Sequence, residues 1–251
     1  MAFLDGDAYL RFMGRFSVPL AGIFAEWSEL PASGTVLDVG CGPGVLTEEL
    51  VRRYGAEQVR AIDPSPAFVA TLQKALPDVD VQLGVAEQLP YADHEFDAAL
   101  AQLVVHFMAD PVVGLGEMRR VTRSGGVVAA CVWDHSGERG PLSQFWAAVR
   151  ATGQPDDDET GRAGVHEGHL AQLFSEAGLT DVRDGHVDVT VPFATFEDWW
   201  EPFTMGVGPA GDHVASLDDG GRDRLRDECR RRLPEPPFEL TASAWSAVGR
   251  A

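Results

Sequence analysis

Residues 35–50 read Thr-Val-Leu-Asp-Val-Gly-Cys-Gly-Pro-Gly-Val-Leu-Thr-Glu-Glu-Leu, and this stretch decides the fold. Its first residues are β-branched or apolar, which predicts a short strand covered on both faces. Glycines at 40, 42 and 44 predict a tight turn that a ligand can approach closely. Apolar residues spaced as on one helix face follow from Val45 onward. The pattern predicts free backbone N–H groups at the carboxyl end of a strand, where open α/β sheets bind ligands.

The spacing of the glycines differs from that of a dinucleotide-binding site. The dinucleotide fingerprint G-x-G-x-x-G would need a third glycine at position 45, where this chain has Val45. Asp38 interrupts the apolar strand just before the turn, and a buried carboxylate is costly without a partner. A positively charged ligand beside Asp38 would supply that partner.

The nonapeptide Val-Leu-Asp-Val-Gly-Cys-Gly-Pro-Gly at 36–44 resembles the first motif of the class I S-adenosylmethionine-dependent methyltransferases. It is most similar to their small-molecule branch, often labelled methyltransferase type 11. The resemblance implies S-adenosylmethionine as cofactor and a Rossmann-like sheet of seven strands, with the antiparallel last strand between the fifth and sixth. Strand and helix patterns alternate five times and end in two strands, which also predicts an α/β, doubly wound fold with helical additions at the N-terminus and in a lid.

The cofactor contacts follow from these motifs. Asp63 ends the second predicted strand about 20 residues past the glycines, where such folds bind the ribose hydroxyls; alternatively it only starts the next helix. The resemblance places Ala86 and Glu87 beside the adenine, although Glu87 also fits an ordinary first-turn helix acid. It places Tyr9 and Arg15 at the methionine end, although Tyr9 also fits a helix face in the core. The complete predicted set is Tyr9, Arg15, Asp38, Gly40, Cys41, Gly42, Gly44, Asp63, Pro64, Ala86, Glu87 and Gln102.

The acceptor side rests on fewer signals. His106 follows the fourth predicted strand, so it is either a hydrogen-bonded core histidine or a general base or substrate anchor. Trp133 ends the fifth predicted strand and, with the Asp-His after it, could reach the substrate. Trp199 and Trp200 belong to an aromatic cluster that fits either the core of a lid helix or an apolar wall for the substrate. The segment 155–161 is predicted to be a polar, mobile loop.

Other catalytic signatures are missing from the sequence. We find no serine nucleophile elbow and no P-loop, and we predict no metal site. His166 and His169 have a possible metal spacing but no third ligand, which favours a solvated helix start. Cys41, Cys131 and Cys229 form neither a disulfide framework nor a zinc spacing, which fits a reducing cytoplasm. The Asn-Pro-Pro-Tyr-type motif that the family uses on amide or base nitrogens is also missing, which argues against those substrates.

Composition limits the partners. The chain has 39 acidic against 20 basic residues, and its net charge of −19 disfavours nucleic acid. Arginines between 222 and 232 alternate with acidic residues, which predicts a solvated helix face. There is no apolar run of about 18 residues and no signal-peptide pattern, so we expect no membrane contact and a cytoplasmic monomer or homodimer. A single lysine, Lys74, indicates a GC-rich bacterial genome.

Three parts are expected along the chain. They are an N-terminal helical cap at 1–34, a cofactor-binding core at 35–194 and 235–251, and a lid at 195–234 inserted between the last two strands. The cap is predicted to hold helices at Asp5–Phe12 and Val18–Leu30. The predicted function is S-adenosylmethionine-dependent methyl transfer to the oxygen, nitrogen or carbon of a small molecule, a reaction that mainly requires alignment and desolvation. The alternatives are a nicotinamide-dependent dehydrogenase, which Val45 disfavours, and a non-catalytic cofactor-binding or interaction protein.

Overall fold

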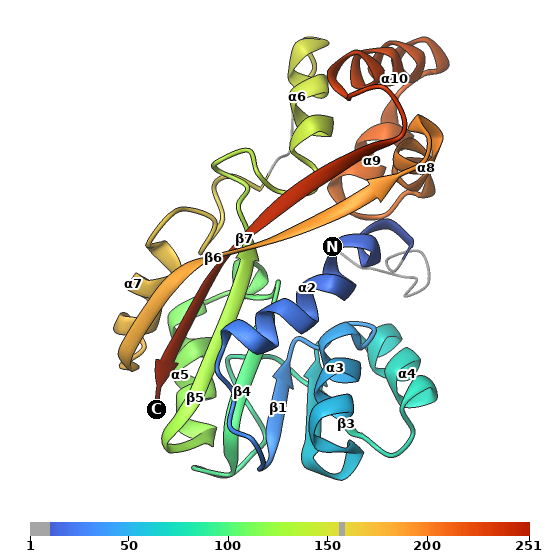
Figure 1. Ribbon diagram of the computed structural model, residues 1–251. Helices are drawn as coiled ribbons and strands as arrows, with labels where there is room; N and C mark the ends of the chain where they lie inside the picture. Colours follow the sequence, from blue (N-terminus) through green and yellow to red (C-terminus); the bar gives the residue numbers. More distant parts are fainter. Residues whose placement is uncertain (1–10, 156–158) are drawn as a thin grey trace.

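A computed structural model describes residues 11–155 and 159–251 of the chain. Within these residues, seven strands form one sheet in the order β3-β2-β1-β4-β5-β7-β6 (Figure 1). The strands are β1 Val36–Val39, β2 Val59–Asp63, β3 Asp80–Leu83, β4 Phe96–Gln102, β5 Thr122–Trp133, β6 Thr180–Phe193 and β7 Phe238–Arg250. Strands β1 to β5 pair in parallel, and β7 lies antiparallel between β5 and β6. The predicted fold class, including the antiparallel seventh strand, is confirmed.

Helices cover both faces of the sheet. They are α2 Gly14–Trp27, α3 Val45–Tyr54, η1 Ala56–Gln58, α4 Pro66–Ala75, η2 Val105–Phe107, α5 Pro111–Val121, α6 Ser143–Ala151, α7 His169–Glu176, α8 Phe196–Trp200, η3 Glu201–Met205, α9 Gly208–Ser216 and α10 Asp219–Arg232. Apolar residues of α2, α3 and α4 belong to one core, and those of α5 and α7 belong to the other. Strand β1 contributes Val36 to the first core and Leu37 to the second, as the alternation of side chains along a strand requires. None of the described helices is both long and apolar enough to cross a membrane.

Glycine is required in the turn after β1. Gly40 and Gly44 have φ angles of 71° and 107°, in the region that disfavours other residues. A Cβ atom on Gly40 would lie 2.5 Å from the Val104 side chain, and one on Gly44 would lie 2.4 Å from Leu72. The turn therefore packs directly against the residues that follow β4 and against α4, and it brings the carboxyl ends of β1, β2 and β4 together.

The N-terminal helix differs from its prediction. The predicted helix at Val18–Leu30 is present but shifted, because α2 begins at Gly14 and ends at Trp27. Its buried face carries Phe16 and Phe24, four residues to either side of Leu20, and Ile23 is 38% exposed. The larger aromatic side chains thus set the rotation of this helix on the sheet. Most of the predicted helix at 5–12 lies outside the described residues.

The last two strands extend well beyond the parallel sheet. Figure 1 shows β6 and β7 running past the end of β5 and carrying α8, α9 and α10 at their far end, next to α6. These helices fall between β6 and β7 in the chain, at the place predicted for the inserted lid. Strand β5 begins directly after α5 and includes residues 123–126.

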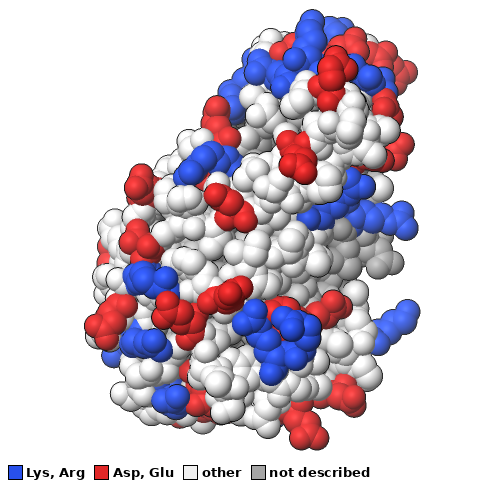
Figure 2. Space-filling view, in the orientation of Figure 1, with Lys and Arg blue, Asp and Glu red and all other residues white. Residues whose placement is uncertain are grey.

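The arginines of α10 form ion pairs on the surface. Figure 2 shows basic and acidic side chains mixed at this end of the molecule. Arg226 and Arg230 lie 2.9 and 2.7 Å from the carboxylate of Glu197 on α8. Arg232 pairs with Glu228 one helical turn earlier. These contacts fit the predicted solvated helix face, and the pairs with Glu197 also join α10 to α8.

Candidate active site

One cavity of about 720 Å³ lies at the carboxyl ends of β1, β2, β4 and β5. Asp38, Asp63, Gln102 and Trp133, which belong to those four strands, line its wall. Small-molecule sites typically measure about 300–1,000 Å³, so this space can hold a cofactor together with a small second ligand. The cavity occupies the place where ligands bind in open α/β sheets.

Asp63 joins two turns at one end of the cavity. Its Oδ2 accepts a hydrogen bond of 2.8 Å from the N–H of Gly42, and its Oδ1 accepts one of 2.8 Å from the N–H of Ser65. Burial raises the pKa of this carboxyl, while the two N–H donors counteract that effect. Each carboxylate oxygen retains a second lone pair, so Asp63 can also accept hydrogen bonds from a ligand.

The glycine turn satisfies much of its own backbone. The N–H groups of Gly40 and Cys41 donate to the carbonyl of Ile62 on β2, and the N–H of Gly44 donates to the carbonyl of Cys41. Together with the bond from Gly42 to Asp63, these contacts occupy all four N–H groups. The expectation of free N–H groups is therefore wrong for these residues. The turn contributes a surface with only small side chains, because Gly40, Cys41, Gly42 and Pro43 line the cavity while Gly44 does not.

Asp38 is a buried acid in the cavity wall. Only 1% of its surface is exposed, and the hydroxyl of Thr47 on α3 donates a 2.6 Å hydrogen bond to its Oδ2. The pKa of Asp38 is raised from 3.8 to about 7, mainly by burial and to a smaller extent by the nearby Asp63, while the Thr47 hydrogen bond opposes the rise. A cation bound in the cavity would favour the ionised form of this carboxyl.

We expect Asp38 to make folding less favourable as the pH rises from 3.8 to about 7. In this range the folded chain retains a proton on Asp38 that the unfolded chain loses, so a higher pH favours unfolding. Relative to Asp38→Asn, the free energy of unfolding of the wild type should fall by at least about 1.4 kcal/mol, the equivalent of one pKa unit. Urea denaturation of both proteins at several pH values in this range measures the difference between their free energies of unfolding. The other carboxyls contribute equally to both proteins, so their contributions cancel in this difference. If the free energies of unfolding of the two proteins changed with pH in parallel, the prediction would be contradicted.

Several buried polar atoms around the cavity have no hydrogen-bond partner within the described parts of the chain. They include Ser17 Oγ, Gln102 Oε1, His106 Nδ1 and Trp133 Nε1, and all four residues line the cavity. Gln102 is fixed at its other end, because its Nε2 donates a 3.0 Å hydrogen bond to the carbonyl of Ser17 on α2. Buried polar atoms normally have partners, so this set fits a ligand that would supply them.

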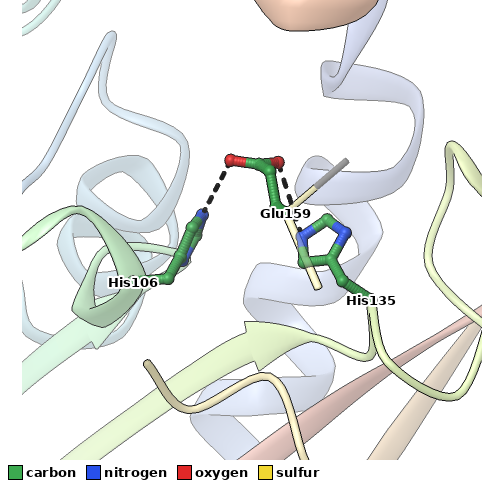
Figure 3. Close-up of side chains that lie close together, drawn as sticks. All are labelled: His106, His135 and Glu159. Carbon is green, nitrogen blue, oxygen red and sulfur yellow. Dashed lines mark ion pairs between the residues drawn. The ribbon is translucent and has the colours of Figure 1, made fainter. Parts of the chain in front are cut away.

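A second group of polar side chains lies at the β4 and β5 side of the same cavity. Figure 3 shows Glu159 between His106 and His135, with one carboxylate oxygen directed to each ring. The distances are 3.9 Å from Glu159 Oε1 to His106 Nε2 and 3.6 Å from Oε2 to His135 Nε2. Burial, with smaller contributions from His135 and Arg162, holds the pKa of His106 well below its usual value of 6.5, so its ring is neutral at neutral pH.

Sequence reasoning did not find Glu159. It lies at the end of an acidic run in the segment predicted to be a polar loop, yet it is only 8% exposed and lines the cavity. Arg162, also missed, places its Nε 3.3 Å from Glu159 Oε1. No local signal distinguishes Glu159 from the acids beside it, because its burial depends on the distant ends of β4 and β5.

Several predicted site residues lie elsewhere. Arg15 is exposed, with its guanidinium 5.3 Å from the centre of the Phe193 ring. Ala86 packs in the core, and Glu87 accepts hydrogen bonds from the N–H groups of residues 109 and 110, so these two residues tie loops together and do not line the cavity. Pro64 does line it, and Tyr9 lies outside the described residues.

The lid tryptophans pack in an aromatic core. Trp199 lies 4.7 Å from Phe203 between ring centres, and Trp200 stacks on Phe196 at 6.3 Å. Both tryptophans are buried, and neither lines the large cavity. The prediction that they form a substrate wall is therefore wrong for this cavity, and the alternative of a lid core describes them.

Comparison with known proteins assigns the family. A family model described as a methyltransferase domain matches residues 37–130. A demethylmenaquinone methyltransferase of Paenarthrobacter aurescens is 30% identical over 178 residues, which are 64% of this chain and 68% of that protein. The chain belongs to the class I S-adenosylmethionine-dependent methyltransferases. An uncharacterized methyltransferase of Mycobacterium tuberculosis is 38% identical over 152 residues, and the match spans 60% of this chain but only 59% of the relative.

Solved structures share the fold of this chain. The YcgJ protein of Bacillus subtilis superposes with a TM-score of 0.59 at 19% identity, over 93% of this chain and 97% of that protein. A geranyl diphosphate methyltransferase in complex with S-adenosylmethionine gives a TM-score of 0.54 at 15% identity, over 95% and 87%. At these identities the likeness describes the fold alone. The residues of the cavity fit the family's cofactor, because they offer buried carboxylates and buried polar atoms beside a turn with only small side chains.

Proposed function

We propose that this chain transfers a methyl group from S-adenosylmethionine to a small molecule held in the same cavity. The observation that carries the proposal is that one continuous cavity joins Asp63 and the glycine turn to His106, His135 and Glu159. When bound, the cofactor supplies a methyl group on a sulfonium sulfur, which retains the bonding electron pair as the acceptor's lone pair takes the methyl carbon. The acceptor loses its proton to the side chains or water at the β4 and β5 end.

The cofactor end would be organised by two carboxylates. Asp63 would accept hydrogen bonds from the two ribose hydroxyls while it retains its bonds to the backbone. Asp38 would face the ammonium of the methionine part, and Gln102 Oε1 would accept a hydrogen bond from a donor on the cofactor. Ala86 and Glu87 remain predicted neighbours of the adenine only if the bound ligand extends beyond the present cavity.

The acceptor end supports a small, partly apolar substrate. Phe12, Leu142 and Trp133 line the cavity together with the two histidines. Gly208 and Pro209 of α9 also line it, so the inserted segment reaches the cavity and fits the proposed lid. Named relatives include a 2-methyl-6-phytyl-1,4-hydroquinone methyltransferase from Synechocystis and the demethylmenaquinone methyltransferase, which supports a small-molecule acceptor. Family membership argues against the dehydrogenase alternative. Cytoplasmic location and a monomeric or homodimeric state stay predictions.

Calorimetric titration with S-adenosylhomocysteine, followed by incubation with methyl-labelled S-adenosylmethionine and a broad metabolite panel, tests the proposal. We expect one molecule bound per chain and a labelled small-molecule product identified by mass spectrometry. Binding without any labelled product would favour the non-catalytic alternative. Failure to bind the cofactor product at high micromolar concentration would overturn the proposal.

A further inference from the structure

The group at the acceptor end is assembled from three separate parts of the chain. His106 lies on η2 directly after β4, His135 lies two residues after the end of β5, and Glu159 comes from the segment before α7. One donor atom from each of the three residues lies within 4.8 Å of the other two. Two imidazoles and one carboxylate form a common set of protein ligands for a metal ion.

The distances suit ligands of a common ion better than hydrogen bonds. The two separations between imidazole nitrogen and carboxylate oxygen, 3.9 and 3.6 Å, exceed the hydrogen-bond range of about 2.7–3.2 Å. Zinc-type ions bind nitrogen and oxygen at about 2.0–2.2 Å, so two ligands of one ion can lie up to about 4.4 Å apart. Both distances fit one ion that Glu159 binds through its two oxygens, with one imidazole beside each oxygen. We propose that His106, His135 and Glu159 hold one divalent transition-metal ion at the acceptor end of the cavity.

The surrounding contacts fix the loop that carries His135. Asp134 is buried, and its carboxylate accepts hydrogen bonds from Gly137 N at 2.7 Å and Arg139 Nε at 2.6 Å, which shape the loop that carries His135. Ser136 then donates a 2.8 Å hydrogen bond to the carbonyl of Val165, which ties this loop to the segment after Glu159. Supporting contacts of this kind orient the ligands of metal sites.

The positive charge of Arg162 repels a bound metal ion and limits the affinity of the site for it. Its Nε lies 3.3 Å from Glu159 Oε1, so guanidinium and metal would share one carboxylate. The Arg162 side chain is 35% exposed and its guanidinium lies 5.1 Å from the centre of the Phe107 ring, at the edge of the site. Water therefore screens its charge more than it screens the buried ligands.

The ligand types select the class of ion. Imidazole nitrogens favour zinc, iron, cobalt, nickel and copper, whereas magnesium and calcium prefer sites made only of oxygen. Three protein ligands also leave coordination positions open, as in catalytic zinc sites. Because the three residues line the cavity, an open coordination position of the ion would face an oxygen of the acceptor. This role in acceptor binding rests on the proposed function, whereas metal binding itself does not.

Titration of the untagged, metal-free chain with Co²⁺, followed by visible absorption, tests the site directly. We expect one Co²⁺ per chain with an absorption spectrum of nitrogen and oxygen coordination, and no competition by Mg²⁺. Changes in the surroundings of metal ligands cost about 10–100-fold in affinity, so His135→Ala and Glu159→Gln, which remove ligands, should cost at least about a hundredfold. His166→Ala removes an exposed histidine outside the group and should bind Co²⁺ as the wild type does.

Cofactor binding serves as the independent readout. Glu159→Gln should still bind S-adenosylhomocysteine, which would demonstrate that the variant is folded, whereas Asp63→Asn should lose that ligand and still bind Co²⁺. The proposal is overturned if the wild type shows no saturable Co²⁺ binding at millimolar concentration. It is also overturned if Glu159→Gln and His135→Ala bind Co²⁺ as tightly as the wild type, since the ion would then lie elsewhere.

Discussion

Asp63→Ala is expected to weaken the binding of S-adenosylhomocysteine by at least about a hundredfold. A hydrogen bond to a charged group contributes about 1.5–3 kcal/mol, and a hundredfold change in affinity corresponds to about 2.7 kcal/mol. Loss of two such bonds to the ribose therefore reaches this size. The same change also removes the acceptors of the Gly42 and Ser65 N–H groups, which should loosen the two turns beside the ligand. Calorimetric titration measures the affinity.

Asp80→Ala is the matched control. Asp80 lies at the amino end of the neighbouring strand β3, where its half-exposed carboxylate pairs with Arg60. The control should bind S-adenosylhomocysteine as the wild type does, because Asp80 lies at the amino ends of the strands and the cavity lies at their carboxyl ends. Wild-type affinity in a folded Asp63→Ala protein would show that Asp63 only organises the turns and does not contact the cofactor.

The parallel half of the fold could be predicted because its signals are local. Short apolar strands, glycines at fixed spacing and a proline after the Ser65 cap each describe a few adjacent residues, and α4 begins where that cap indicates. Asp63 was found for the same reason, since its position depends only on the end of one strand. The family resemblance then supplied the place of the antiparallel seventh strand between the fifth and sixth, which no local pattern contains.

The acceptor side could not be derived in this way. Glu159 belongs to an acidic loop in the sequence, and only the ends of β4 and β5 turn it into a buried neighbour of His106 and His135. The rotation of α2 could not be predicted for a similar reason, because several residue spacings fit a helix and the sheet selects the one with Phe16 and Phe24 inside. Long-range packing decides such features, and hydrophobic periodicity alone does not contain it.

The position of the two tryptophans of the inserted segment could not be decided from the sequence. Trp199 and Trp200 occur in a segment that could form either a lid core or a wall of the site. In the structure their rings pack on Phe203 and Phe196 instead of the large cavity. Residues of α9 that carried no signal, Gly208 and Pro209, reach the cavity instead. Substrate selection by the inserted segment would therefore depend more on backbone position than on large side chains.

His106→Ala is expected to lower turnover by about a hundredfold while the affinity for S-adenosylhomocysteine stays within about threefold of the wild type. His106 lies in the cavity beside Glu159, and it comes from η2 instead of the glycine turn or the end of β2. Loss of this ring removes a group that would bind the acceptor or hold the proposed ion beside it, yet it leaves Asp38 and Asp63 in place. Initial rates of methyl transfer to the acceptor found in the metabolite panel measure the effect.

His186→Ala is the control for the loss of a histidine ring. His186 lies on β6 with its side chain 46% exposed, and its change should affect neither turnover nor stability. If His106 were only a core histidine, His106→Ala would lower the free energy of unfolding, and the loss of turnover would follow the fraction of unfolded protein. Urea denaturation separates the two cases, because a catalytic role predicts slow turnover in protein that is fully folded. Unchanged turnover in a folded variant would remove His106 from the site and leave the acceptor to the residues that surround it.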